Sequence, residues 1–162
     1  MVPRNFSRVD LLKNHSPPYF AAMNDPDFFE SAAVLPWAPV SPGFELKVLH
    51  GERDDDTRAL LLRLAPGTVI GRHRHTGEVH AWHLQGQRKL LETGEVIGPG
   101  GYVYEPPGNE DSWMAVGAEP LVIFVTVRGV IEELDEEGRV TARMSTGSVA
   151  ENYRRFVAEA RP

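Results

Sequence analysis

The chain has 162 residues, of which 41% are hydrophobic and 25% charged, an ordinary composition for one globular domain with a hydrophobic core. Its 17 basic and 23 acidic residues give a formal charge of −6 without any basic stripe, so nucleic acid is not an expected partner. Because the chain contains no cysteine, disulfides, thiolate metal sites and a cysteine nucleophile are excluded. Any metal ion must therefore be held by nitrogen and oxygen ligands.

The N-terminal segment, residues 1–43, is rich in proline and predicts an extended arm. Within the arm, Asp25 followed by Pro26 is typical of a helix start and predicts a short helix through Glu30. We expect the aromatic side chains of this helix to pack on the main body. No signal peptide or membrane-spanning stretch is found, so a cytoplasmic location without membrane contact is expected.

From residue 44 to residue 146, short runs rich in Val, Ile, Leu, Thr and Tyr alternate with turns rich in Gly and Pro. This spacing predicts an all-β domain of the sandwich, barrel or jelly-roll kind and does not suit a βαβ sheet. The acidic cluster around Gly138 is interpreted as a solvated hairpin turn. The predicted strands are Phe44–His50, Arg58–Ala65, Val79–Gln85, Arg88–Glu92, Gly101–Glu105, Ser112–Val116 and Leu121–Arg128.

The last residues, 147–162, change to a helical period. Ser148 and Glu151 have the spacing of a capping box, which predicts that one amphipathic helix begins there. Its apolar stripe is expected to cover the barrel or a neighbouring subunit, and consists of Val149, Tyr153, Phe156, Val157 and Ala160.

The pair His73 and His75 is the strongest functional signal in the chain. Side chains two residues apart on a strand point to the same face, so the two imidazoles can bind one metal ion. A site completed by a carboxylate would differ in chemistry from one with three histidines, and Asp111 occupies the position where a third histidine would be expected.

A larger spacing pattern surrounds these residues. Gly67 precedes His73 by six positions and Gly86 ends the next predicted strand, while Gly100, Pro106 and Asp111 form a second motif. Together the two motifs resemble those of the cupin superfamily, which implies a double-stranded β-helix, the jelly-roll barrel, with metal ligands inside.

The chain further resembles the 2,4'-dihydroxyacetophenone dioxygenase group, which is related to acetylacetone-cleaving dioxygenases and to the sensor domain of ChrR-type anti-sigma factors. The resemblance covers most of the chain from residue 35 onward. It implies a non-haem enzyme that binds a divalent metal, Fe(II) or alternatively Zn, Ni or Mn, and uses O2 to cleave a carbon–carbon bond next to a carbonyl. It is carried by Leu35-Pro36-Trp37, Pro66-Gly67-Thr68-Val69-Ile70, His73-Arg74-His75-Thr76-Gly77, Val79-His80 and Tyr102-Val103-Tyr104-Glu105-Pro106-Pro107-Gly108.

In this group a glutamate on the following strand joins the metal shell, and Glu92 fits that position best, with Glu95 and Glu78 as alternatives. The resemblance therefore implies a metal site formed by His73, His75, Glu92 and Asp111. Two readings remain open, because Asp111 also suits a turn that begins a strand and Glu92 also suits a solvated strand end.

Two further residues are candidates for catalysis. Residue parity from His73 and His75 places His83 on the interior face together with Val79 and Ala81, which suits a role in polarising substrate or supporting the metal. Tyr104 is a second candidate, because it would either line the pocket or fill the core.

Three functions follow from these observations. The first is the dioxygenase with a small carbonyl substrate and O2; the second is a non-catalytic cupin that binds or senses a metal or small ligand; the third is a Zn-dependent hydrolase or isomerase. A homodimer or homotetramer is expected, because a small barrel need not bury the proline-rich arm and the terminal helix against itself.

Overall fold

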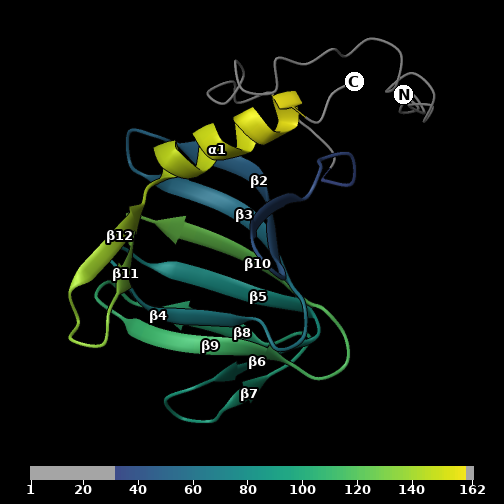
Figure 1. Ribbon diagram of the computed structural model, residues 1–162, viewed down its shortest axis with the longest axis vertical. Helices are drawn as coiled ribbons and strands as arrows, with labels where there is room; N and C mark the ends of the chain where they lie inside the picture. Colours follow the sequence, from purple (N-terminus) through teal and green to yellow (C-terminus); the bar gives the residue numbers. More distant parts are fainter. Residues whose placement is uncertain (1–31, 160–162) are drawn as a thin grey trace, which may run out of the picture.

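The computed structural model describes residues 32–159, which form two antiparallel six-stranded sheets and one helix (Figure 1). Sheet A has the strand order β1-β2-β3-β10-β5-β8, and sheet B has the order β12-β11-β4-β9-β6-β7. The elements are β1 (Ala38–Ser41), β2 (Phe44–Glu52), β3 (Thr57–Leu64), β4 (Val69–His75), β5 (Val79–Gln85), β6 (Gln87–Leu90), β7 (Val96–Ile97), β8 (Tyr102–Glu105), β9 (Glu110–Val116), β10 (Leu121–Arg128), β11 (Ile131–Leu134), β12 (Val140–Met144) and α1 (Thr146–Glu159).

The all-β jelly-roll prediction is confirmed, and its physical basis is visible in β10. Leu121, Ile123, Val125 and Val127 alternate along this strand and are all buried, because every second side chain faces sheet B. Strands β3 and β5 flank β10 on its two edges, so its backbone groups are paired on both sides. Side chains from the inner faces of both sheets form one core.

The chain crosses from sheet A to sheet B at Gly86, between β5 and β6. Gly86 has a positive φ of 69°. A Cβ atom at this position would lie 2.5 Å from the carbonyl oxygen of Pro120, so no larger residue fits without moving the backbone. Gly86, which the sequence spacing singled out, therefore forms the tight turn after which β6 pairs with β9 in sheet B.

The first strand lies inside the expected proline-rich arm. β1 contains Pro39 and pairs only with β2, as an edge strand can without losing ladder hydrogen bonds. The short helix predicted near Asp25 and the rest of the arm before residue 32 lie outside the described residues.

The acidic cluster forms the hairpin β11–β12, as expected, with its turn at Asp135–Gly138. One member of the cluster departs from the solvated interpretation. Glu132 is buried, and its carboxylate oxygens lie 2.6 Å from Arg74 Nη2 and 3.0 Å from Arg143 Nε. Two arginines therefore compensate for removing this carboxylate from water.

Helix α1 begins earlier than predicted, and the capping box at Ser148 and Glu151 is wrong. Ser145 is the N-cap: its hydroxyl accepts a hydrogen bond from the Ser148 amide at 3.2 Å, and the Ser148 hydroxyl accepts one from the Ser145 amide at 3.0 Å. A serine at the third helical position satisfies the cap amide as the expected glutamate would.

The helix lies over β2 and β1 (Figure 1) and is held by Tyr153. Tyr153 is buried, and its hydroxyl donates a hydrogen bond of 2.8 Å to the Pro36 carbonyl.

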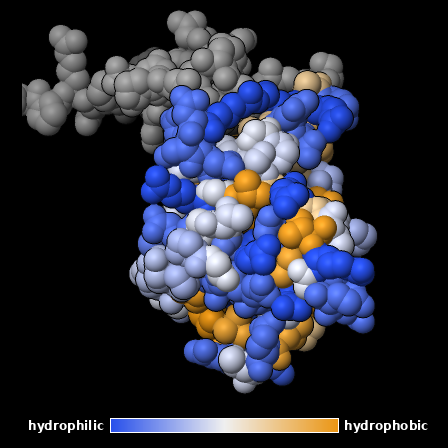
Figure 2. Space-filling view, turned by 90° about the vertical axis from the view of Figure 1, so that its left-hand side faces the viewer, coloured by the Kyte–Doolittle hydropathy of each residue, from blue (hydrophilic) through white to orange (hydrophobic). Residues whose placement is uncertain are grey.

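The side turned to the viewer in Figure 2 is mostly hydrophilic, with separate apolar patches, one of them at the level of β6 and β7. Between residues 32 and 159, α1 is too short and too polar to cross a bilayer.

Candidate metal centre

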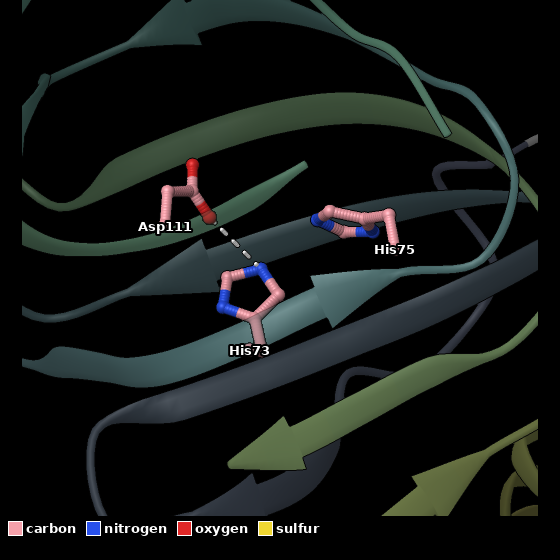
Figure 3. Close-up of side chains that lie close together, drawn as sticks. All are labelled: His73, His75 and Asp111. Atoms are coloured by element: carbon pink, nitrogen blue, oxygen red, sulfur yellow. Dashed lines mark ion pairs between the residues drawn. The ribbon is translucent and has the colours of Figure 1, made fainter. Parts of the chain in front are cut away.

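The alternation of β4 brings His73 and His75 to the same inner face of sheet B, as the sequence predicted. Both rings are buried, while Arg74 between them points away and pairs with Glu132. Asp111 lies on the adjacent strand β9, directly opposite His73 in the β4–β9 register. The Nε2 atom of His73 is 3.3 Å from Oδ1 of Asp111. Figure 3 shows the three side chains converging, and one ligand atom from each lies within 4.8 Å of the others.

The ring of His73 is held in one orientation by the backbone. Its Nδ1 lies 2.9 Å from the Gly71 carbonyl oxygen, which only accepts hydrogen bonds, so the proton of the neutral ring sits on Nδ1. Nε2 then presents its lone pair toward Asp111. A histidine that donates one ring N–H to a backbone carbonyl is the arrangement in which the other nitrogen ligates a metal.

His75 contacts Glu105, a residue that the sequence interpretation did not include. Nε2 of His75 lies 2.9 Å from Oε2 of Glu105, but neither ring nitrogen of His75 has a partner in hydrogen-bond geometry. Burial alone would raise the pKa of Glu105, but the contact with His75 and the charge of Arg88 outweigh burial and hold the pKa below its ordinary value. Burial and the nearby charge of Glu105 raise the pKa of Asp111.

The unpartnered atoms test whether this group suits a metal ion. Both ring nitrogens of His75 and Oδ1 of Asp111 are buried without a hydrogen bond. Buried polar atoms are nearly always paired, and leaving them unpaired costs free energy. A divalent cation would take one ring nitrogen of His75 and Oδ1 of Asp111 as ligands and so satisfy two of these three atoms, and the residues therefore fit an N/O metal site.

Glu92, the expected fourth ligand, is not brought into this group. Its side chain is exposed, and its Oε1 accepts hydrogen bonds from the amide of Ser112 at 2.7 Å and from the Ser112 hydroxyl at 2.6 Å. Burial would raise the pKa of Glu92, but these hydrogen bonds lower it below the ordinary value. In the part of the chain that is described, Glu78 and Glu95 also lie outside the ligand group.

The two catalytic candidates lie in different places. His83 is fully buried on the interior face with Val79 and Ala81, as residue parity predicted. Its Nδ1 lies 3.0 Å from the Gly101 carbonyl, its Nε2 has no partner, and burial lowers its pKa. Tyr104, in contrast, is 49% exposed on the outer face of sheet A, where it lies opposite His80 in the β5–β8 register. The structure therefore does not bring Tyr104 to the metal group.

Arg88 is the second site residue that the sequence interpretation missed. It is buried on β6, its Nη1 lies 3.3 Å from Oε1 of Glu105, and its guanidinium lies 5.2 Å from the centre of the Trp113 ring. The signal that was available is parity: Glu105 shares a face with Val103, and Arg88 shares one with Leu90. A charged residue at an inward position of a strand indicates a polar site inside the barrel.

These residues line a cavity of about 450 Å³ between the two sheets. His73, His75, Arg88 and Glu105 form one polar part of its lining, and the other polar residues of the wall are Ser41, Arg58, Arg72, Glu133 and Thr141. Most of the remaining wall is aliphatic or aromatic. A largely apolar cavity with a few convergent polar groups is typical of a small-molecule site. The aliphatic and aromatic wall includes Leu60, Leu62, Trp113, Ile123, Val125 and Val127.

Comparisons with known proteins agree with this fold. A family model described as the ChrR Cupin-like domain matches residues 26–130. An RmlC-like cupin from Ralstonia eutropha superposes with a TM-score of 0.75 at 24% identity, over 82% of this chain and 88% of that one. An acetylacetone dioxygenase from Acinetobacter johnsonii superposes with a TM-score of 0.72 at 14% identity, over 80% and 92% of the two chains.

A third solved structure, KdgF from a Halomonas species, has a TM-score of 0.54 at 21% identity, over 63% of this chain and 94% of that one. At these identities the likenesses show the cupin fold. No curated protein matches the chain significantly.

Proposed function

Because the chain belongs to the ChrR cupin-like domain family, we propose that it is a mononuclear metal-dependent enzyme of the dioxygenase type. Its working metal would be Fe(II), and its reaction the cleavage by O2 of a carbon–carbon bond next to a carbonyl in a small ketone, diketone or hydroxyketone. The observation that carries the proposal is the buried group of His73, His75 and Asp111 beside a largely apolar cavity, in which the ligand atoms of His75 and Asp111 lack hydrogen-bond partners.

The composition of the ligand group supports this assignment. Two histidines and one carboxylate that leave other coordination positions open are typical of non-haem Fe(II) oxygenases. Substrate and O2 both need such open positions. The fold likeness to an acetylacetone dioxygenase is compatible with the same reaction class.

The residues of this chain have separable roles in the proposed reaction. His73, His75 and Asp111 would hold the ion, and the Gly71 carbonyl fixes the ring of His73 for that purpose. When bound, the ion supplies what side chains lack, namely polarisation of the carbonyl and reaction with O2. The aliphatic wall excludes water and accommodates the apolar part of the substrate.

Oxygen uptake tests the proposal. Fe(II)-reconstituted protein should consume O2 with at least one member of a panel that includes acetylacetone and 2,4'-dihydroxyacetophenone. The activity should be lost in His73→Ala and in Asp111→Ala, while Glu119→Gln, an exposed turn residue, serves as the matched control. Absence of O2 uptake over the whole panel, with metal content confirmed, would overturn the proposal.

A non-catalytic metal- or ligand-binding module is the second candidate, favoured by Glu105. This carboxylate lies 2.9 Å from His75, so the centre contains two buried carboxylates, which would offset the charge of the ion and reduce its Lewis acidity. Stoichiometric metal that depends on His73 and His75, without turnover of any kind, would favour this candidate. Turnover that is insensitive to anaerobiosis and supported by zinc would instead indicate a hydrolase or isomerase.

A further inference from the structure

Arg88 has hydrogen-bond donors that the protein itself does not satisfy. Its side chain is 3% exposed, and only Nη1 lies near an acceptor, at 3.3 Å from Oε1 of Glu105. Nε and Nη2 are both buried without any hydrogen-bond partner. Because a guanidinium offers five donors and stays charged, this is a costly arrangement for a buried arginine.

A second buried arginine has both terminal nitrogens satisfied and only its Nε without a partner, as expected when its role is structural. Arg58 is 1% exposed, and its two terminal nitrogens donate to the Gly129 carbonyl at 2.9 Å, the Thr146 hydroxyl at 3.2 Å and the Met144 carbonyl at 3.3 Å. Arg58 thereby connects β3 to the segment at the start of α1. Arg88 makes no comparable connection: in addition to Nε, its terminal Nη2 lacks a partner, which leaves one whole edge of the guanidinium without an acceptor.

The position of Arg88 identifies where a ligand that supplies this acceptor would lie. Arg88 belongs to the wall of the same cavity as His73 and His75. The two oxygens of Glu105 bridge the sites, with Oε2 at 2.9 Å from His75 and Oε1 at 3.3 Å from Arg88. The guanidinium and the metal group are thus separated by one carboxylate group, and a small molecule is long enough to contact both. Trp113, below the guanidinium, supplies an apolar surface beside it.

The charges of the cavity indicate the sign of the ligand. With a divalent ion present, the formal charges around the metal group, those of the ion, Arg88, Glu105 and Asp111, sum to +2 + 1 − 1 − 1 = +1. The other charged residues of the lining, Arg58, Arg72 and Glu133, add a further +1. A net positive charge in an apolar cavity is unfavourable, and an anionic ligand would offset it. Adjacent Nε and Nη2 donors match the two oxygens of a carboxylate in a bidentate pair.

We propose that Arg88 binds the carboxylate of an anionic substrate, so that the natural substrate is a small monocarboxylate with an apolar body. That the bound carboxylate is a substrate rests on the proposed function, whereas the binding of a carboxylate by Arg88 does not. Arg88 acts here as a specificity-determining residue, since it holds the acid group while the carbonyl of the same molecule faces the metal group.

Calorimetric binding of a matched pair of probes tests the proposal. The probes are 4-phenylbutanoate and 4-phenylbutanamide, which have nearly the same shape and differ in charge, titrated into the zinc-reconstituted and the metal-free protein. Zinc is chosen because it undergoes no redox change. Zinc-reconstituted wild-type protein should bind the acid at least about tenfold more tightly than the amide, as expected for a charge-assisted hydrogen bond. Arg88→Gln should abolish this preference, and Arg88→Lys, which keeps the charge without the fork, should retain part of it.

The matched control is Arg63→Gln, because Arg63 is a surface arginine paired with Glu45. This variant should keep the full preference for the acid. Equal affinity for acid and amide in the wild type, no detectable binding of either, or a preference that survives Arg88→Gln would each overturn the proposal. The wild-type comparison needs no variant, so the proposal stays falsifiable even if Arg88→Gln does not fold.

Oxygen uptake with acetylacetone, a neutral substrate, separates this proposal from the proposed function. If the wild-type protein consumes O2 with acetylacetone but shows no preference for the acid over the amide, the anion site alone would be overturned. An acid preference that depends on Arg88, in protein that never consumes O2, would support the anion site and overturn the dioxygenase assignment.

Discussion

Asp111 lies directly across the strand pair from His73, with its Oδ1 3.3 Å from Nε2 of the imidazole. Both side chains are buried, and Oδ1 has no hydrogen-bond partner. The β4–β9 register thus places a carboxylate where its unpaired oxygen and the His73 lone pair can share one cation. Asp111 is therefore the carboxylate of the group that could hold a metal ion.

Replacing Asp111 separates ligation from a turn-forming role. Asp111→Ala should weaken binding of a divalent ion on the order of a hundredfold, because one ligand and one negative charge are lost. Asp111→His should retain tight binding, since it offers a third imidazole. The measurement is competition with a chromophoric chelator, and Asp111→Ala protein that binds as tightly as the wild type would show that Asp111 is a strand residue only.

Metal binding should stabilise the folded chain. An ion at about a hundred times its dissociation constant adds about 2.7 kcal/mol, which raises the melting temperature of a domain of this size by roughly 5–10 °C. His75→Ala should melt at the same temperature with and without metal in a calorimetric scan. Glu92→Gln should keep the shift, because Glu92 hydrogen-bonds to Ser112 and not to the ligand group; loss of the shift in this variant would restore Glu92 as a ligand.

Removing the Arg58 side chain should destabilise the fold strongly. Arg58→Met leaves the Gly129 and Met144 carbonyls and the Thr146 hydroxyl without their buried donor. We expect a loss of about 2–4 kcal/mol in the free energy of unfolding by urea titration. The control is Arg63→Met, where the half-exposed pair with Glu45 should change the stability by less than about 1 kcal/mol. Equal losses in the two variants would contradict this interpretation of Arg58.

His83 should make the stability fall in mild acid. Burial lowers its pKa, so below about pH 6.5 the imidazole takes up a proton in the unfolded chain and resists protonation in the folded one. The destabilisation by His83 is absent at pH values above the unfolded pKa and grows as the pH falls. The charge of Arg88 disfavours the protonated imidazole, and the charge of Glu105 favours it. The difference in unfolding free energy between wild type and His83→Asn should therefore change between pH 7 and pH 5. A pH-independent difference would contradict the buried neutral ring.

Several parts of the site could be predicted from local patterns alone. The period of two along a strand places His73 and His75 together, puts His83 on the same interior and directs His80 and Trp82 outward. Gly86 could be predicted as a strand end, because a residue without a side chain is needed at the crossing between sheets. These features depend only on neighbours in the chain.

Other parts depend on contacts between distant strands. Glu92 and Glu105 are both glutamates near strand ends, and although parity with Val103 indicates that Glu105 faces inward, it does not identify what either carboxylate contacts. In the fold, Ser112 donates hydrogen bonds to the exposed carboxylate of Glu92. Glu105 on β8 instead points into the barrel, where its carboxylate contacts His75 and Arg88.

The sequence by itself determined the all-β class, the paired histidines and their common face, because these follow from side-chain periodicity and from turn residues. Asp111 was also indicated by the motif spacing, but the tertiary structure alone showed that Glu105, and not Glu92, is the second carboxylate beside those histidines. Asp111 contacts His73, Glu105 contacts His75, and Arg88 contacts Glu105. These three residues come from three different strands, and the pairing of those strands is set by the packing of the whole core.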